Sequence, residues 1–322
     1  MQYRQQIQAL EHWLDSQIIG QQTLVNRLLI ALLADGHLLV EGAPGLAKTK
    51  AIKILAQGIE GNFHRIQFTP DLLPTDITGT EIYRAQEGTF EFQQGPIFHN
   101  LILADEINRA PAKVQSALLE AMAERQVSFG RQTFKLPDLF LVMATQNPIE
   151  QEGTYPLPEA QLDRFLMQVN IDYPDASSER SILQLVRNEA LAAGTGAAPV
   201  PPVVTQDAIF AARRDLLTLH MAPVVEDYIV QLTLATRNPA AYGDDLAHWL
   251  DYGASPRGTI ALDLCARANA FLHGKDFVSP DDVQAVVHDV FRHRIIVSFE
   301  AEATGIDADT VIETLVQRVA AA

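Results

Sequence analysis

The sequence predicts an α/β domain built on a parallel sheet, followed by an all-helical domain. In the first half, short apolar segments alternate with segments of helical periodicity, and this alternation is typical of a parallel sheet with helical connections. After about residue 175, helical patterns continue without a convincing strand. We therefore expect one domain over residues 1–175 and a second over 176–322, a division that the chain length also allows.

Each element of this prediction comes from local periodicity. Helices are expected at residues 3–17, 21–33, 49–59 and 110–125, the last with Pro111 in its first turn. Strands are expected at residues 37–42, 63–68, 101–105, 139–145 and 166–171. Hairpins are expected at about 79–95, where the pattern alternates around Gly88, and at 126–136. A flexible break is expected at 192–204.

Composition excludes some classes of function. The formal net charge is −16, and no run of lysine and arginine segregates positive charge, so we expect no binding to nucleic acid. The N-terminus lacks the apolar core of a signal peptide, and no apolar run has the length of a membrane span.

The single cysteine, Cys265, is expected to be buried and inert. One cysteine cannot crosslink the chain, so the cytoplasm is the expected location.

Residues 41–50, EGAPGLAKTK, differ at one position from the phosphate-binding pattern G-x-x-x-x-G-K-[ST]. Ala47 stands where the second glycine is usual. The segment follows an expected strand and begins an expected helix, the context in which backbone N–H groups bind phosphate. Ala47 keeps its N–H, and a small side chain is tolerated there if its backbone angles are ordinary. The predicted phosphate loop comprises Gly42, Ala43, Pro44, Gly45, Leu46, Ala47, Lys48 and Thr49.

Polar side chains end two further expected strands. In LILADEINRA, Asp105 and Glu106 follow four apolar residues. An aspartate there can hold Mg²⁺ together with the Thr49 hydroxyl, and the adjacent glutamate can orient an attacking water. In VMATQNP, Asn147 could contact the same water. The alternatives are an acidic strand end that faces solvent and a simple Asn-Pro turn.

Two arginines stand at defined places. Arg164, in PEAQLDRF, lies just before the last expected strand of the α/β domain. Arg257, in ASPRGTIAL, begins a helix of the second domain, with Ser255 as its expected cap. A single arginine is usually a solvated charge, so position alone does not assign a function to either.

Together these motifs resemble the AAA+ ATPases, and specifically the MoxR family. The resemblance rests on three long blocks and, more loosely, on SPRGT and FRHRI in the second domain; the blocks are residues 67–79, 95–127 and 144–165. It covers about residues 10–300. Family loops commonly read G-x-P-G-x-A-K-T, so the resemblance implies that Ala47 is a family trait and not a sign that the nucleotide site has lost its function. The segment 79–95 suits the insert in the second helix that defines this AAA+ branch.

The resemblance implies a role for each motif. Lys48 and Thr49 would serve the phosphates of ATP or ADP, Thr49 and Asp105 would bind Mg²⁺, and Glu106 would serve the water. Asn147 resembles sensor 1 and Arg257 sensor 2. Arg164 resembles the arginine finger that reaches the nucleotide of a neighbouring subunit. Ile19 and Gly20, in IIGQ, would contact adenine.

The implied activity is Mg²⁺-dependent ATP hydrolysis that drives chaperone-like remodelling or maturation of a partner protein or metalloenzyme complex. The family implies a homo-oligomeric ring, usually of six subunits, a protein client, and a von Willebrand factor A-domain partner. Three alternatives stay open: a magnesium-chelatase-like motor subunit, a nucleic-acid motor of the same branch, and a nucleotide-gated scaffold. The acidic charge disfavours the nucleic-acid motor, and the intact Glu106 and Arg164 disfavour the scaffold. The aromatics Tyr83, Phe90 and Phe92 of the first hairpin could grip a client or simply pack on their own domain.

Overall fold

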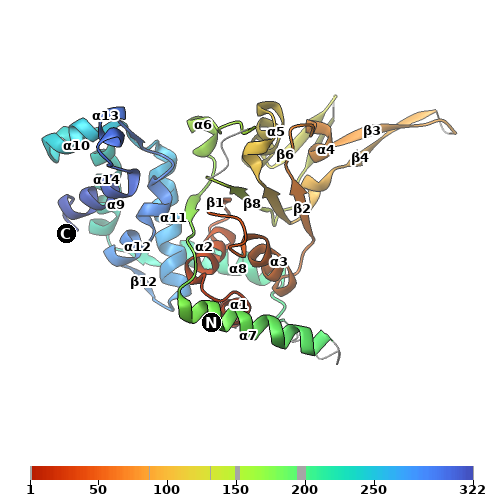
Figure 1. Ribbon diagram of the computed structural model, residues 1–322, viewed down its shortest axis with the longest axis horizontal. Helices are drawn as coiled ribbons and strands as arrows, with labels where there is room; N and C mark the ends of the chain where they lie inside the picture. Colours follow the sequence, from red (N-terminus) through yellow and green to blue (C-terminus); the bar gives the residue numbers. More distant parts are fainter. Residues whose placement is uncertain (1, 87, 131, 149–152, 194–200, 322) are drawn as a thin grey trace. The chain divides into compact units, whose positions relative to one another are not determined.

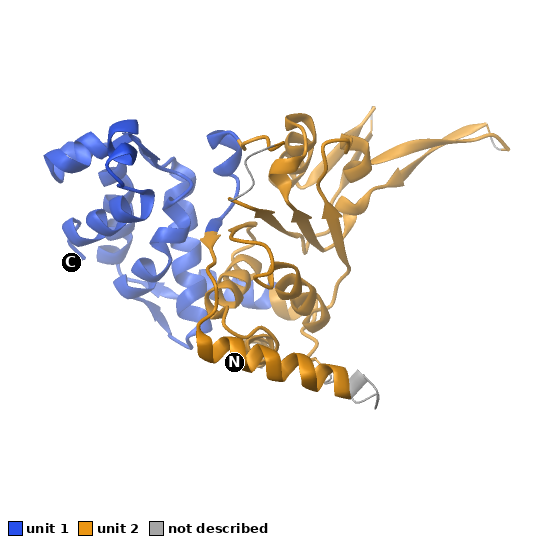
Figure 2. Cartoon of the chain, in the orientation of Figure 1, with its two compact units in different colours: residues 1, 158–168, 210–322 blue, residues 2–157, 169–209 orange. Residues whose placement is uncertain are grey.

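The structure is a computed structural model that describes residues 2–86, 88–130, 132–148, 153–193 and 201–321. The chain divides into two compact units (Figures 1 and 2). The core unit comprises residues 2–157 and 169–209, and the lid unit comprises residues 158–168 and those from 210 onward. These units do not follow the boundary expected at residue 175, because residues 158–168 group with the lid, whereas helix α7 (Ala176–Ala193) groups with the core.

A five-stranded sheet forms the centre of the core unit. Its strands lie in the order β2-β5-β8-β1-β9, and the β2–β5, β5–β8 and β8–β1 pairs are parallel. The segments predicted as strands are confirmed, with bounds that differ by at most two residues: β1 (Leu38–Glu41), β2 (Phe63–Gln67), β5 (Leu101–Asp105), β8 (Leu141–Gln146) and β9 (Met167–Asn170). Strands β1, β5 and β8 are buried along nearly their whole length, as expected for a sheet covered on both faces.

The predicted core helices are also confirmed. They are α1 (Gln2–Gln17), α2 (Gln22–Leu33), α3 (Lys48–Gly58) and α5 (Ala112–Glu124). Pro111 is the residue before α5 rather than a residue of its first turn, because the helix starts two positions later than expected. Shorter helical segments lie between α3 and α5: α4 (Pro74–Thr78), η1 (Pro96–Phe98) and η2 (Ile107–Arg109). The short helix α6 (Glu159–Leu162) follows β8 and belongs to the lid unit.

Both predicted hairpins are present. Strands β3 (Gly79–Arg84) and β4 (Thr89–Gln94) form an arm that extends away from the rest of the core unit (Figure 1). The second hairpin pairs β6 (Gln126–Phe129) with β7 (Gln132–Lys135). At the base of the arm, Phe92 stacks on Phe134 of β7 with ring centroids 4.2 Å apart. Tyr83 and Phe90 face each other farther along the arm and are 55% and 67% exposed. Phe92 therefore packs on its own unit, whereas Tyr83 and Phe90 face solvent.

The lid unit consists mainly of helices. They include the end of α8 (Gln206–Leu217), then α9 (Pro223–Arg237), η3 (Pro239–Ala241), α10 (Asp244–Trp249), α11 (Pro256–Leu272), α12 (Pro280–Phe291), α13 (Phe299–Ala303) and α14 (Ala308–Arg318). Cys265 on α11 is buried, as predicted. In the residues that the structure describes, no helix is both long and apolar enough to cross a membrane.

The expectation of a second domain without strands is wrong in detail. Strand β10 (His220–Met221) pairs with β12 (Phe277–Val278), and β11 (Leu250–Tyr252) pairs with β13 (Ile296–Val297). These strands are two or three residues long, too short to leave an alternating pattern in the sequence. The predicted break at 192–204 lies partly outside the described residues, and Val204 forms a bridge with Ile59 of the core unit.

Candidate nucleotide site

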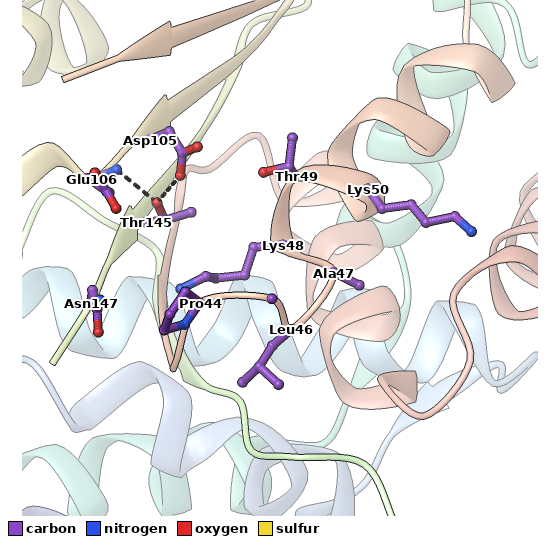
Figure 3. Close-up of a pocket in the computed structure, with 11 residues that line it drawn as sticks. Pro44, Leu46, Ala47, Lys48, Thr49, Lys50, Asp105, Glu106, Thr145 and Asn147 are labelled. Atoms are coloured by element: carbon purple, nitrogen blue, oxygen red, sulfur yellow. Dashed lines mark hydrogen bonds between the residues drawn. The ribbon is translucent and has the colours of Figure 1, made fainter. Parts of the chain in front are cut away.

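A cavity of about 310 Å³ opens in the core unit where β1, β5 and β8 end (Figure 3). Because these strands are parallel, their carboxyl ends meet at one edge of the sheet, the usual ligand position in an open α/β sheet. The cavity is lined by Pro44, Gly45, Leu46, Ala47, Lys48, Thr49, Lys50, Asp105, Glu106, Thr145 and Asn147. Three motifs that are separate in the sequence therefore contribute to one site.

Ala47 does not have the ordinary backbone angles that were expected for a residue with a side chain at this position. Its φ of 60° and ψ of 13° are left-handed, a region that costs a residue with a Cβ about 1–2 kcal/mol. Ala47 immediately precedes α3, and its methyl side chain cannot cap the first-turn N–H groups of that helix. The residues of that first turn, Lys48, Thr49 and Lys50, line the cavity, and N–H groups at the start of a helix are favourable to an anionic ligand.

Gly42, at the start of the loop, lies against the chain that follows β9. A Cβ at this position would come 2.5 Å from Cγ1 of Ile171 and 2.7 Å from its carbonyl oxygen. The Ile171 N–H donates to the Glu41 carbonyl at 2.9 Å, which holds the two segments together. Only glycine therefore fits at position 42.

Lys48 lies between the ends of β1 and β8. Its Nζ donates to the carbonyl of Gly42 at 2.6 Å and to that of Gln146 at 3.5 Å. Burial lowers the pKa of the Lys48 ammonium, although the nearby carboxylates, chiefly Asp105 and Glu106, partly oppose this shift. A partly desolvated cation thus lies beside the loop, where it can bind phosphate strongly.

Asp105 and Glu106 are linked through Thr145 of β8. The Thr145 hydroxyl donates to Oδ1 of Asp105 at 2.7 Å and accepts from the backbone N–H of Glu106 at 2.9 Å (Figure 3). Glu106 has a left-handed φ of 57°, so its conformation is also strained. The threonine therefore holds the end of β5 in a fixed geometry beside the cavity.

Two side chains of β2 also contact these carboxylates. Arg65 donates to Oδ2 of Asp105 at 3.0 and 2.7 Å, and Gln67 donates to Oε2 of Glu106 at 3.0 Å. Arg65 and Gln67 are also hydrogen-bonded to each other at 2.6 Å. Arg65, Gln67 and Thr145 were not among the site residues predicted from the sequence. One signal was present for Thr145, which precedes Asn147 by two residues and so projects from the same face of its strand.

The donor set of this cavity fits a nucleotide with Mg²⁺. The Thr49 hydroxyl and the Asp105 carboxylate both line the cavity, and oxygen ligands of these types are those that Mg²⁺ prefers. Lys48 and the helix N-terminus supply the positive potential that phosphates require.

Ile19 and Gly20, the predicted adenine contacts, precede α2. Gly20 has a φ of 77°, and a Cβ there would come 2.9 Å from Cβ of Pro174. The adjacent Gln21 donates to the Asp172 carbonyl at 2.9 Å. Gly20 and Gln21 therefore pack against the segment after β9, which also contacts Gly42.

Arg164 and Arg257 belong to the lid unit, whereas the cavity belongs to the core unit. Arg164 lies between α6 and β9 and is partly buried. Arg257 is in the first turn of α11, and its N–H donates to the Ser255 hydroxyl at 3.1 Å, which confirms the predicted cap.

Comparison with known proteins agrees with this architecture. A model of the ATPase family associated with various cellular activities (AAA) matches residues 37–167, and a model of the AAA lid domain matches residues 247–315. "Chaperone MoxR1" of Mycobacterium tuberculosis H37Rv is 48% identical over 313 residues, which cover 94% of this chain and 79% of that protein. The chain belongs to the MoxR family of AAA+ ATPases.

Other MoxR relatives extend the comparison. "Protein MoxR" of Paracoccus denitrificans is 35% identical, with 88% of this chain and 87% of that protein covered. A protein from Cytophaga hutchinsonii, whose crystal structure is known, is 45% identical in sequence. Its structure matches this one with a TM-score of 0.89, over 99% of this chain and 96% of that one. The predicted fold, an AAA+ core with a helical lid, is confirmed, and membership of the MoxR family makes the chain a nucleotide-binding ATPase.

Proposed function

We propose that the cavity at the carboxyl ends of β1, β5 and β8 is where this ATPase hydrolyses ATP with Mg²⁺. The convergence of Lys48, Asp105, Glu106 and Asn147 on one cavity carries the proposal. The first-turn N–H groups of α3 and the Lys48 ammonium would bind the phosphates. Thr49 and Asp105 would hold Mg²⁺, which would neutralise charge that develops on the phosphates during hydrolysis.

Glu106 would orient the attacking water. Its backbone is fixed by Thr145 and its carboxylate is hydrogen-bonded to Gln67, so it is held at the edge of the cavity before a nucleotide arrives. Asn147 would contact the same water as sensor 1. Ile19 and Gly20 would lie against adenine. Arg65 forms an ion pair with the Asp105 carboxylate. Mg²⁺ that binds to this carboxylate would therefore replace the Arg65 guanidinium.

A binding measurement and a turnover measurement together test these assignments. Glu106→Gln should bind ATP normally but hydrolyse it about 10²- to 10⁴-fold more slowly, because the phosphate contacts remain while the general base is lost. Lys48→Ala should weaken nucleotide binding itself. Glu120→Gln, which changes an exposed carboxylate on α5, is the matched control and should behave as wild type. Hydrolysis by Glu106→Gln at the wild-type rate would show that the role assigned to Glu106 is wrong.

We further propose that hydrolysis drives chaperone-like remodelling or maturation of a partner protein. The support is the similarity to a relative named as a chaperone and the exposed aromatic pair on the β3–β4 arm. The working form would be a homo-oligomeric ring of six subunits in the cytoplasm, with a von Willebrand factor A-domain protein as a partner. Capture on immobilised Glu106→Gln with ATP, compared with Lys48→Ala, would identify the client. A client retained equally by both variants would argue against nucleotide-dependent binding.

A further inference from the structure

The lid unit contains a buried network around Arg164. The segment 163–166 connects α6 to β9 as turns and bends, so its carbonyl groups lie outside any regular hydrogen-bond ladder. Buried carbonyls require partners. Phe165 and Leu166 are almost fully buried, so the partners of this segment must come from the lid itself.

Arg294 supplies most of these partners. Its guanidinium donates to the carbonyls of Phe165 at 2.5 Å and Leu166 at 3.0 Å, and to Oδ1 of Asp163 at 2.9 Å. The Arg294 side chain is only 3% exposed. Nε2 of His293 also donates to the Phe165 carbonyl at 3.1 Å. A carbonyl oxygen can only accept, so the neutral ring of His293 carries its proton on Nε2. Arg294 therefore contacts the residue on each side of Arg164.

Asp163 extends this network to α11. Its Oδ2 accepts from the Ser255 hydroxyl at 2.8 Å and lies 3.7 Å from Nη1 of Arg257. Ser255 is the N-cap of α11, and Arg257 is in the first turn of that helix. A single, mostly buried carboxylate thus contacts Arg294, the cap of α11 and Arg257.

We infer that Asp163 and Arg294 are positioning residues that hold Arg164 in its working geometry and tie it to the first turn of the helix that carries Arg257. The inference rests on the proposed function, in which Arg164 acts on the nucleotide of a neighbouring subunit. The arginine's backbone is fixed on both sides by one guanidinium, which is planar and can serve several acceptors at once. Because Asp163 joins this segment to α11, Arg164 and Arg257 move together.

This arrangement gives the ring a path between neighbouring sites. Arg257, as sensor 2, would respond to the subunit's own nucleotide, and Arg164 would act on the next one. A displacement of the first turn of α11 reaches Arg164 through Ser255 and Asp163. Misplacement of a catalytic group by about 1 Å costs about 100-fold in rate, so loss of this support is measurable in turnover.

Steady-state kinetics provide the first test. Asp163→Asn keeps the size of the side chain but weakens its bonds to Arg294 and Arg257. It should lower kcat about 10- to 100-fold while leaving the Kd for ATP unchanged. Arg294→Lys keeps a positive charge but cannot span both flanks of Arg164, and it should show the same pattern. Asp245→Asn, which breaks the Asp245–Arg318 ion pair elsewhere in the lid, is the matched control for general loss of stability.

Mixed assemblies separate positioning from a purely structural defect. Asp163→Asn subunits should regain turnover when they exchange with Lys48→Ala subunits, whose Arg164 is intact. They should not regain it with Arg164→Ala subunits, because no interface then holds a positioned arginine. Two results would overturn the inference: wild-type kcat in Asp163→Asn, or equal recovery with both partners. Failure of the Arg164→Ala and Lys48→Ala pair to recover would instead count against the proposed trans role of Arg164; the kcat of Asp163→Asn would then still decide the positioning role.

Discussion

At the scale of single residues, two strained backbones border the cavity. Ala47 and Glu106 both have φ near 60°, a region in which residues with a Cβ are uncommon. Ala47 precedes α3, the helix proposed to bind phosphate, and Glu106 follows the strand that ends at Asp105. Such strain persists only where the surroundings over-determine it. At Glu106 the determinant is Thr145, which binds its N–H.

Replacing Ala47 with glycine should relieve strain without loss of binding. Glycine adopts a positive φ freely, and the relief of about 1–2 kcal/mol outweighs the added entropy of the unfolded chain, about 0.4–1 kcal/mol. We expect Ala47→Gly to have an equal or slightly higher melting temperature and an unchanged Kd for ATP. Ala47→Val should be destabilised, because β-branched side chains are disfavoured at positive φ. A clear loss of stability in Ala47→Gly would contradict the left-handed conformation.

At the scale of elements, periodicity predicted the five strands of the sheet and the helices α1, α2, α3 and α5, whereas the short helical segments and the contacts between elements could not be read from the sequence. Strand order places β2 beside β5 and so brings Arg65 and Gln67 to Asp105 and Glu106. Nothing local in FHRIQF indicates this. Residues 158–168, which group with the lid, are likewise bonded by Arg294, about 130 positions later in the chain. Motif residues were predictable because their backbone context is local; their supporting side chains come from distant segments.

The β3–β4 arm should act through its exposed aromatic pair. Tyr83 and Phe90 have ring centroids 5.0 Å apart and both face solvent, so replacing them with serine should leave folding and basal ATPase unchanged. Client-dependent activity, measured with the captured client, should be lost. Thr80→Ala combined with Gln93→Ala is the control, because these residues pair across the same hairpin without aromatic surface. Unfolding of the Tyr83→Ser, Phe90→Ser variant would favour a structural role.

The α12–α14 contact in the lid should be sensitive to pH. His288 of α12 faces Asp309 and Glu313 of α14, each at 3.4 Å, with Arg292 nearby. The hydrogen bond to Asp309 raises the pKa of His288 above its ordinary value of 6.5. A raised folded-state pKa stabilises the fold fully below the unfolded value, and that contribution is lost as pH rises through the folded value.

Melting temperatures across this pH range test the contact. The wild type should lose part of its stability as the pH rises above about 6.5, and His288→Gln should lack that component. His220→Gln, at an exposed lid position, should keep it. An identical pH profile in wild type and His288→Gln would contradict the assignment.

At the scale of the whole molecule, the residues proposed to act in ATP hydrolysis come from both units. The proposed phosphate loop, the proposed Mg²⁺ ligands and Glu106 belong to the core, and Arg164 and Arg257 belong to the lid. If Arg164 serves a neighbour, subunits must pack head to tail, and such contacts close into a ring when the rotation permits. A guanidinium that neutralises transition-state charge in this way contributes roughly 10³- to 10⁵-fold in rate in other P-loop enzymes.

ATP turnover in mixed assemblies of Arg164→Ala and Lys48→Ala subunits tests this account most directly. Each variant alone should hydrolyse ATP very poorly, Arg164→Ala despite nearly normal ATP binding. After subunit exchange, the mixture should regain part of the wild-type rate, because some interfaces then combine an intact Lys48 with an intact Arg164. A stable monomer that hydrolyses ATP as fast as the assembly, at a rate that still depends on Arg164, would contradict it.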